Sequence, residues 1–334
     1  MQYLISRTPC RISLFGGGTD YENFINKNGQ ANILSFTIDK FVYSLIKKNN
    51  LSHKIFNEKY RLNYFNSEKS KTIGNIKNKI VKKILLDYDK INPYYISLFS
   101  DIPSGTGLGS SSAFIVGMIK SFHKINKLKI NSNKIFTKTV ETERKTINKN
   151  AGLQDQAAAT FGGFNHFIFK KNKSLIVRNL NKYKKNLDKI IKNSFLIWTE
   201  DQRDSSKILG KQKKNINNKI KILKKMDQIS LRALKLIKSK NFDLNKFAEI
   251  LKYSFTLKRS LTDGITNNNI NKIIKILDYE KALGYKILGA GGGGFILCIM
   301  SKNKKAKFLN KYKKKFKMIE YSFQNSSTQF LYYK

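Results

Sequence analysis

Proline, cysteine and long apolar runs are scarce in this sequence. Its three prolines rule out long proline-rich linkers. Its two cysteines, Cys10 and Cys298, stand far apart and fit neither a disulfide framework nor a metal-binding spacing. No apolar run reaches the roughly 18 residues that a membrane-spanning helix needs, and the opening residues do not resemble a signal peptide. We therefore expect a cytoplasmic protein without a membrane partner.

Acidic residues are also scarce, because 22 Asp and Glu stand against 65 Lys and Arg, a formal net charge of +43. Such a balance is compatible with nucleic acid, an anionic membrane or anionic small molecules as partners. The lysines are, however, spread along the whole chain among Asn and Ile, and no zinc-finger spacing, basic zipper or aromatic RNA-binding signature accompanies them. We attribute the charge to a bias in composition and expect no nucleic-acid partner, although a positive surface would attract phosphorylated ligands.

Length and pattern favour an α+β protein of two domains. At 334 residues the chain is long for a single hydrophobic core. Strands are predicted at 33–46, 94–99, 161–169 and 194–199, and helices at 110–122, 133–147, 205–237, 243–257 and 269–283. Helices do not alternate regularly with strands, which favours α+β over a doubly wound sheet. We place the domains at 1–185 and 186–334.

The clearest chemical signal is the segment PSGTGLGSSS at residues 103–112, between a predicted strand and a predicted helix. Glycine allows close backbone approach and positive φ, and the amides of a first helical turn attract anions. The segment has neither the Gly-Lys-Ser/Thr ending of a Walker A loop nor the spacing of a dinucleotide fingerprint. Three alternating glycines followed by three serines favour a nucleotide polyphosphate site over a simple tight turn.

Two further segments are rich in glycine. LGAGGGGF at 288–295 has four consecutive glycines, more than a sharp hairpin needs, which indicates close backbone approach. FGGGTD at 15–20 ends on Asp20, which by itself is compatible with a turn residue. The second of these segments is a weak signal alone.

Two carboxylates are candidates for phosphoryl-transfer chemistry. Nucleotide-bound Mg²⁺ takes one or two protein carboxylates, and a kinase needs a group that positions or deprotonates the attacking hydroxyl. Glu143 in ETER and Asp155 in QDQ fit these two roles. Glu141 and Glu143 are two residues apart on a predicted helix and face nearly opposite sides, so only one of them can enter the site.

Together these segments resemble the GHMP kinases, the family of galactokinase, homoserine kinase, mevalonate kinase and phosphomevalonate kinase. The three glycine-rich motifs occur in the family's order, and the resemblance covers most of the chain. It implies a two-domain α+β fold, in which an N-terminal βαβ-rich domain and a C-terminal ferredoxin-like domain enclose ATP, Mg²⁺ and the substrate.

The resemblance also implies roles for single residues. Asp155 would be the catalytic acid-base or orienting residue, and Arg11 would stabilise it and the incoming alkoxide. Glu143 would bind Mg²⁺, with Ser110 or Ser111 beside it. The implied ATP-binding residues are Pro103, Gly105, Gly107, Leu108, Gly109, Ser110, Ser111 and Ser112, and the implied substrate-binding residues are Gly17, Gly18, Thr19, Asp20, Arg203, Gly291 and Gly292.

Within the family, GGGTDY, QDQAAATFGGFN and the WTxxQRDSS stretch at 198–206 are most similar to the heptose-phosphate kinases. These enzymes phosphorylate the anomeric hydroxyl of D-glycero-D-manno-heptose 7-phosphate, for nucleotide-activated heptose and surface polysaccharide. Gly17 and Gly18 replace the Glu-His of galactokinases and leave room for a substrate with an anionic tail. Arg203, Lys258 and Arg259 are candidate cations for that tail, with Ser205 and Ser206 as further donors.

Other interpretations stay open. A kinase for L-fucose or a uronic acid would use the same motifs. An inactive, ligand-binding regulator on the same fold is disfavoured because Arg11, Glu143 and Asp155 are all present. A basic nucleic-acid binder would leave both glycine loops unexplained. We expect a small phosphosugar as the ligand and leave a homodimer open.

Overall fold

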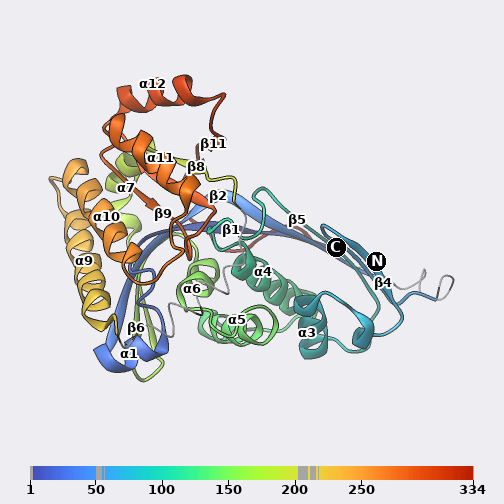
Figure 1. Cartoon of the computed structure of the whole chain (residues 1–334). Coiled ribbons are helices and arrows are strands. Elements are labelled where there is room, and N and C mark those ends of the chain that lie inside the picture. Colours follow the sequence, from blue (N-terminus) through green and yellow to red (C-terminus); the bar gives the residue numbers. More distant parts are fainter. Residues whose placement is uncertain are drawn as a thin grey trace.

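The chain folds into two β-sheets with helices packed against them (Figure 1). The computed structural model describes residues 3–49, 55, 57–201, 210, 216 and 218–333. The strands are β1 (Tyr3–Phe15), β2 (Gln30–Lys48), β3 (Tyr60–Asn63), β4 (Ser67–Ser70), β5 (Tyr94–Ser100), β6 (Phe164–Lys170), β7 (Leu175–Asn179), β8 (Ser194–Trp198), β9 (Gly284–Ile287), β10 (Phe295–Ile299), β11 (Met318–Ile319) and β12 (Gln329–Tyr333). The α-helices are α1 (Glu22–Asn28), α3 (Lys79–Tyr88), α4 (Ser110–Ile125), α5 (Ser132–Thr146), α6 (Gln154–Phe161), α7 (Lys184–Lys192), α9 (Ile220–Lys238), α10 (Leu244–Arg259), α11 (Asn268–Tyr279) and α12 (Lys302–Tyr312).

The larger sheet is organised around the long strand β2. β1 pairs with β2 along almost its whole length, while β6 pairs with the first part of β2 and β5 with the last part. Helices α3, α4 and α5 lie on one side of this sheet (Figure 1). Helix α4 comes close to β1 because Gly117 has no side chain; a Cβ there would lie 2.6 Å from the Thr8 hydroxyl oxygen.

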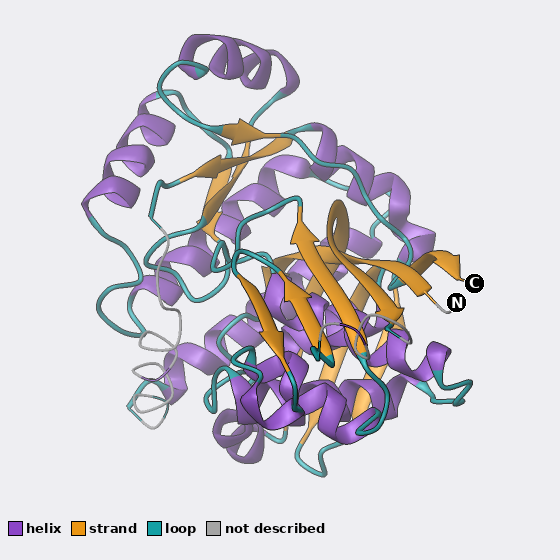
Figure 2. Cartoon of the chain, turned by 90° about the vertical axis from the view of Figure 1, so that its right-hand side faces the viewer, coloured by secondary structure: helices purple, strands orange, loops and turns teal. Residues whose placement is uncertain are grey.

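The smaller sheet has the antiparallel order β11-β8-β10-β9, and Figure 2 shows it beside the larger sheet with its own helices. Helix α10 packs closely on β9 at Gly284, where a Cβ would lie 2.3 Å from the backbone oxygen of Ala248. The last strand, β12, returns to the larger sheet and pairs with β1.

These elements confirm the predicted α+β class and most predicted elements. The predicted strand at 33–46 is β2, and the predicted helix at 110–122 is α4. The predicted helix at 205–237 is described from 220 onward as α9, while part of its first stretch lies outside the described residues. The division at residue 185 stays a prediction, with the addition that β12 rejoins the first sheet.

Two further expectations concern cysteines and membranes. Cys10 and Cys298 are both free, in agreement with their distant spacing, and both are buried. Over the described residues, no helix combines the length and the apolar character required to cross a bilayer.

Candidate active site

The three glycine-rich segments meet at one cavity. Its wall is formed by β1 and the turn after it, the loop before α4 and the first turn of that helix, the start of α6, the end of α10 and the second glycine run. The predicted site residues that line it are Arg11, Gly18, Asp20, Gly105, Gly107, Gly109, Ser110, Ser111, Ser112, Glu143, Asp155 and Gly291. Arg11 and Gly293, 282 positions apart in the sequence, therefore contribute to one site.

The loop before α4 is fixed by backbone contacts on both sides. The Arg11 amide donates to the Leu108 carbonyl at 2.9 Å, and the Phe295 amide donates to the Thr106 carbonyl at 3.1 Å. Gly109, the residue before α4, has a φ of 73° in the left-handed region, which glycine adopts without strain. The chain thus turns sharply into α4 and presents Ser110, Ser111 and Ser112 to the cavity.

The first turn of α4 is suited to bind an anion. The first amides of a helix have no partner within the helix, and the helix dipole adds positive potential there. The Ser110 and Ser111 hydroxyls supply further donors in the same wall, while the Ser112 hydroxyl donates to Glu143. This arrangement fits the phosphates of a nucleotide.

The two glycine runs touch backbone to backbone, which explains why both need glycine. A Cβ on Gly107 would lie 2.6 Å from the Leu288 carbonyl oxygen, and a Cβ on Gly289 would lie 2.6 Å from the Gly107 Cα. Both residues also have positive φ. The second run therefore supports the loop before α4 from behind, which the resemblance to the GHMP kinases implies for Gly289–Gly293.

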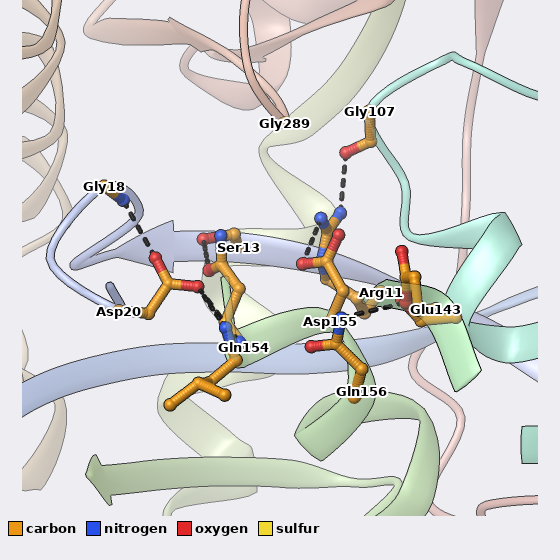
Figure 3. A network of polar contacts seen from close by, with 12 residues as sticks. Arg11, Ser13, Gly18, Asp20, Gly107, Glu143, Gln154, Asp155, Gln156 and Gly289 are labelled. Atoms are coloured by element: carbon orange, nitrogen blue, oxygen red, sulfur yellow. Dashed lines mark hydrogen bonds and ion pairs between the residues drawn. The ribbon is translucent and has the colours of Figure 1, made fainter. Parts of the chain in front are cut away.

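Arg11 connects this loop to Asp155 (Figure 3). Its Nη1 donates to the Gly107 carbonyl at 2.6 Å, while Nε and Nη2 both donate to Asp155 Oδ1, at 3.0 and 2.6 Å. Arg11 is 2% exposed and the Asp155 side chain is 30% exposed. Because the guanidinium occupies Oδ1, Asp155 can direct Oδ2 toward a reactant in the cavity.

Glu143 lies deeper in the same wall. Its Oε2 accepts hydrogen bonds from the Ser112 hydroxyl at 2.6 Å and from Gln156 Nε2 at 2.8 Å (Figure 3). Burial raises the pKa of Glu143 to about 7 because it disfavours the charged carboxylate, and the charge of Asp155 adds to this shift. The hydrogen bonds from Ser112 and Gln156 and the charge of Arg11 oppose it. Glu141 is exposed instead and pairs with Lys138, so the predicted opposition of the two glutamates is confirmed.

The donor set around Glu143 fits a magnesium ion held largely by a nucleotide. Both protein partners of the carboxylate use Oε2 and leave Oε1 for a metal. Over the described part of the chain, no cluster of three or more His, Cys, Asp or Glu could hold a metal alone. One carboxylate and a serine hydroxyl are what Mg²⁺ needs when phosphates and water complete its coordination.

Asp20 binds backbone amides, a contact that the sequence did not predict. Its Oδ2 accepts the amides of Leu153 and Gln154, at 2.9 and 3.1 Å, and its Oδ1 accepts the Gly18 amide at 3.2 Å. These contacts place Asp20 at the N-terminus of α6, the helix that carries Asp155 (Figure 3). Gly152 makes room for this approach, since a Cβ there would lie 2.1 Å from Asp20 Oδ2.

This geometry leads to a prediction about stability. Asp20→Ala should lower the free energy of unfolding by about 1–2 kcal/mol, the usual loss when a helix N-terminus loses its cap. Urea denaturation measures it. Asp263→Ala is the control, because Asp263 is exposed and an exposed site should change stability by less than about 0.5 kcal/mol. Equal stability of Asp20→Ala and the control would show that Asp20 does not hold α6.

Several predicted residues do not face the cavity. Leu108 is fully buried in the hydrophobic core, and Pro103 is exposed away from the site. Thr19 is also fully buried and donates its hydroxyl to the Gly16 carbonyl. Gly17 and Gly292 lie beside the cavity residues without lining the wall.

The candidate cations for an anionic tail differ in position. Lys258 lines the cavity, whereas Arg259 is exposed and lies over the Phe255 ring. Arg203, Ser205 and Ser206 lie outside the described residues.

Sequence reasoning gave no role to Gln154 and Gln156, which line the cavity beside Asp155. Gln156 donates to Glu143, and Ser13 donates its hydroxyl to Gln154 Oε1 at 2.8 Å. In the QDQ segment the sequence pointed to the carboxylate of Asp155 only. The available signal for Gln154 and Gln156 is that both are polar residues directly beside a catalytic candidate.

Comparisons with known proteins match both parts of the chain to one family. The family model for the GHMP kinases N terminal domain matches residues 75–163, and that for the GHMP kinases C terminal domain matches residues 233–317. The first match contains the loop before α4, Glu143 and Asp155, and the second contains Lys258 and the second glycine run.

Individual relatives cover almost the whole chain. The D-glycero-alpha-D-manno-heptose 7-phosphate kinase of Campylobacter jejuni is 30% identical over 322 residues, 94% of each chain. The mevalonate kinase of Methanocaldococcus jannaschii is 26% identical over 332 residues, 93% of this chain and 96% of the relative. A solved structure described as a D-glycero-D-manno-heptose 1-phosphate kinase from Bacteriodes thetaiotaomicron has a TM-score of 0.79 at 21% identity, covering 98% of this chain and 99% of its own.

Proposed function

The chain belongs to the GHMP kinase family, and we propose that it transfers a phosphoryl group from ATP to the anomeric hydroxyl of D-glycero-D-manno-heptose 7-phosphate. The observation that carries the kinase assignment is the Arg11–Asp155 pair. It fixes a carboxylate at the cavity wall and is itself bonded to the loop before α4. A group that positions the attacking hydroxyl is thereby held in register with the predicted phosphate site.

The residues of this chain would divide the work as follows. The loop before α4 and the serines at its start would bind the nucleotide phosphates. Asp155 Oδ2 would accept or orient the proton of the attacking hydroxyl. Arg11 keeps Asp155 in place and adds positive charge near the developing alkoxide.

Magnesium is part of the proposal. Glu143 Oε1 and the Ser110 hydroxyl are the groups that would hold it, and both residues line the cavity. When bound, Mg²⁺ would neutralise charge on the transferring phosphate.

The choice of sugar rests on similarity and on space. The Campylobacter jejuni relative, 30% identical, is described as a heptose 7-phosphate kinase. Gly18 lines the cavity beside Asp20 without a side chain, which leaves room for a substrate longer than a hexose. Lys258 adds a cation to the same wall. A product phosphorylated at the anomeric carbon would then serve nucleotide-activated heptose and surface polysaccharide.

The test is a comparison of substrates. We expect the wild-type kcat/KM for heptose 7-phosphate to exceed that for free heptose by about two to four decades. Two charge-assisted contacts of roughly 1.5–3 kcal/mol each account for such a ratio. A coupled ATP-consumption assay measures both values, with L-fucose and a uronic acid as further acceptors. Equal use of the free and the phosphorylated heptose would refute the phosphosugar assignment and leave the kinase assignment intact.

The remaining expectations stay predictions. They are a cytoplasmic location, a small phosphosugar as the ligand, and no nucleic-acid or membrane partner. Homodimer formation stays open. Nucleic-acid binding would appear as an electrophoretic shift with a steep salt dependence.

A further inference from the structure

Lys258 is a buried cation in the active-site wall that the kinase mechanism above does not use. It lies in the last turn of α10, is 5% exposed and lines the cavity. Its Nζ donates to the backbone carbonyl of Gly289. Within the described part of the chain, no carboxylate lies within ion-pairing distance of this ammonium.

The neighbouring charges are already satisfied by other partners. Asp155 is paired with Arg11, and Asp20 accepts three backbone amides. Lys286, the other buried lysine nearby, donates to the carbonyls of Ser13 and Leu14. Lys258 therefore has one neutral acceptor, although an ammonium carries three donors.

Burying an ammonium without a counter-charge is costly, so a site that retains one must gain from it elsewhere. Asp20, Asp155 and Arg11 all act electrostatically on Lys258, which places the ammonium within range of the catalytic carboxylate. Since Asp20 accepts three backbone amides, Asp155 is paired with Arg11 and neither forms an ion pair with Lys258, an anion brought by a reactant is the group that can compensate this cation directly.

We propose that Lys258 binds a phosphate group of the reactants in the cavity that the first turn of α4 also lines. This inference rests on the proposed kinase function. The phosphate has two sources, the group being transferred from ATP and the phosphate that the sugar already carries. The experiment separates them.

The charge state of Lys258 provides a second readout. Burial lowers the pKa of Lys258 to about 8; Arg11 lowers it further, and Asp20 and Asp155 oppose the shift. The charged groups that face it are Arg11 on β1, Asp20 after β1, Asp155 on α6 and Lys286 on β9. Because the protonated ammonium binds phosphate, activity that depends on it should fall as the pH rises through about 8.

The experiment compares Lys258→Met with Lys246→Met. Lys246 lies on the same helix with a 70% exposed side chain, so the control loses the same charge away from the cavity. Lys258→Met should lower kcat/KM for heptose 7-phosphate by about tenfold to a hundredfold, the loss of one charge-assisted contact. An equal loss with free heptose assigns the transferred phosphate, and a loss confined to heptose 7-phosphate assigns the sugar's own. Kinetics identical to those of the control would overturn the proposal.

Lys258 could have a purely structural role, in which it only holds the Gly289 carbonyl. The variant Lys258→Arg distinguishes this role from phosphate binding. Arginine stays charged at all accessible pH values, so the decline of kcat/KM above about pH 8 should disappear in this variant. A decline that persists unchanged contradicts phosphate binding by Lys258. This comparison also serves if Lys258→Met fails to fold.

Binding of inorganic phosphate, measured by calorimetry, separates this inference from the proposed function. Suppose that the wild type phosphorylates no sugar, and that Lys258→Met binds inorganic phosphate more weakly than the wild type. The sugar-kinase proposal then fails and the anion site stands. If the wild type phosphorylates heptose 7-phosphate and Lys258→Met matches its control in both assays, only this inference fails.

Discussion

Asp155→Asn is expected to lower turnover by about two to four decades, the usual contribution of a positioned acid-base group, and to leave ATP binding nearly unchanged. Asparagine keeps the shape of the side chain and one oxygen that accepts from Arg11, as Asp155 Oδ1 does. It cannot take a proton from the attacking hydroxyl. Steady-state kinetics measures turnover, and calorimetry measures ATP affinity.

Asp263→Asn is a suitable control for this variant, because Asp263 is exposed and does not line the cavity. Near-normal turnover of Asp155→Asn would move the role to another group. A loss of ATP affinity as large as the loss of turnover would instead indicate that the Arg11–Asp155 pair mainly supports the loop before α4, through the bond from Arg11 to Gly107.

Glu143→Gln is expected to raise the Mg²⁺ concentration required for half-maximal activity and to lower turnover. Removal of an outer partner of a metal ligand typically costs about tenfold to a hundredfold in activity. Because Glu143 would be a direct ligand, the loss of turnover should exceed that range. The variant keeps the volume of the side chain and its contact with the Ser112 hydroxyl. Titration of activity with Mg²⁺ at saturating ATP measures the effect.

Glu141→Gln is the matched control, since it makes the same change two residues away on the same helix. Its side chain pairs with Lys138 at the surface, so activity and Mg²⁺ requirement should stay close to those of the wild type. A sensitive Glu141 and an insensitive Glu143 would mean that the metal lies on the opposite face of α5.

Much of the site could be predicted because many of its residues belong to short sequence motifs. The alternation of Gly105, Gly107 and Gly109 ahead of three serines encodes a sharp turn into a helix, and that turn is what the structure shows. Helical periodicity predicted that only one of Glu141 and Glu143 can enter the site, and the family resemblance implied that it is Glu143. In both cases the information lies within a few consecutive residues.

The contacts between segments could not be predicted in this way. Asp20 was expected at the substrate, but both of its oxygens bind backbone amides, and two of those amides begin α6 more than 130 residues later. Lys258 could not be separated from exposed Arg259 by sequence, because adjacent residues on a helix differ in burial only once the helix is docked. Such assignments depend on tertiary packing, which a single sequence does not encode locally.

The same limit applies to the small contacts that make the site rigid. Gly107 and Gly289 are 182 positions apart, yet their backbones touch. The residues of each run predicted only a close backbone approach, and it was the family resemblance that implied support of the first run by the second. The bond from Arg11 to the Gly107 carbonyl joins a third segment to this contact.

The most direct test of the account is the position of the phosphate in the product. The purified protein is incubated with ATP, Mg²⁺ and heptose 7-phosphate, and the sugar product is examined by phosphorus and carbon NMR. The account predicts a second phosphate ester on the anomeric carbon, formed by the wild type and strongly reduced in Asp155→Asn. A second phosphate on another carbon, or ATP hydrolysis without any phosphorylated sugar product, would contradict it.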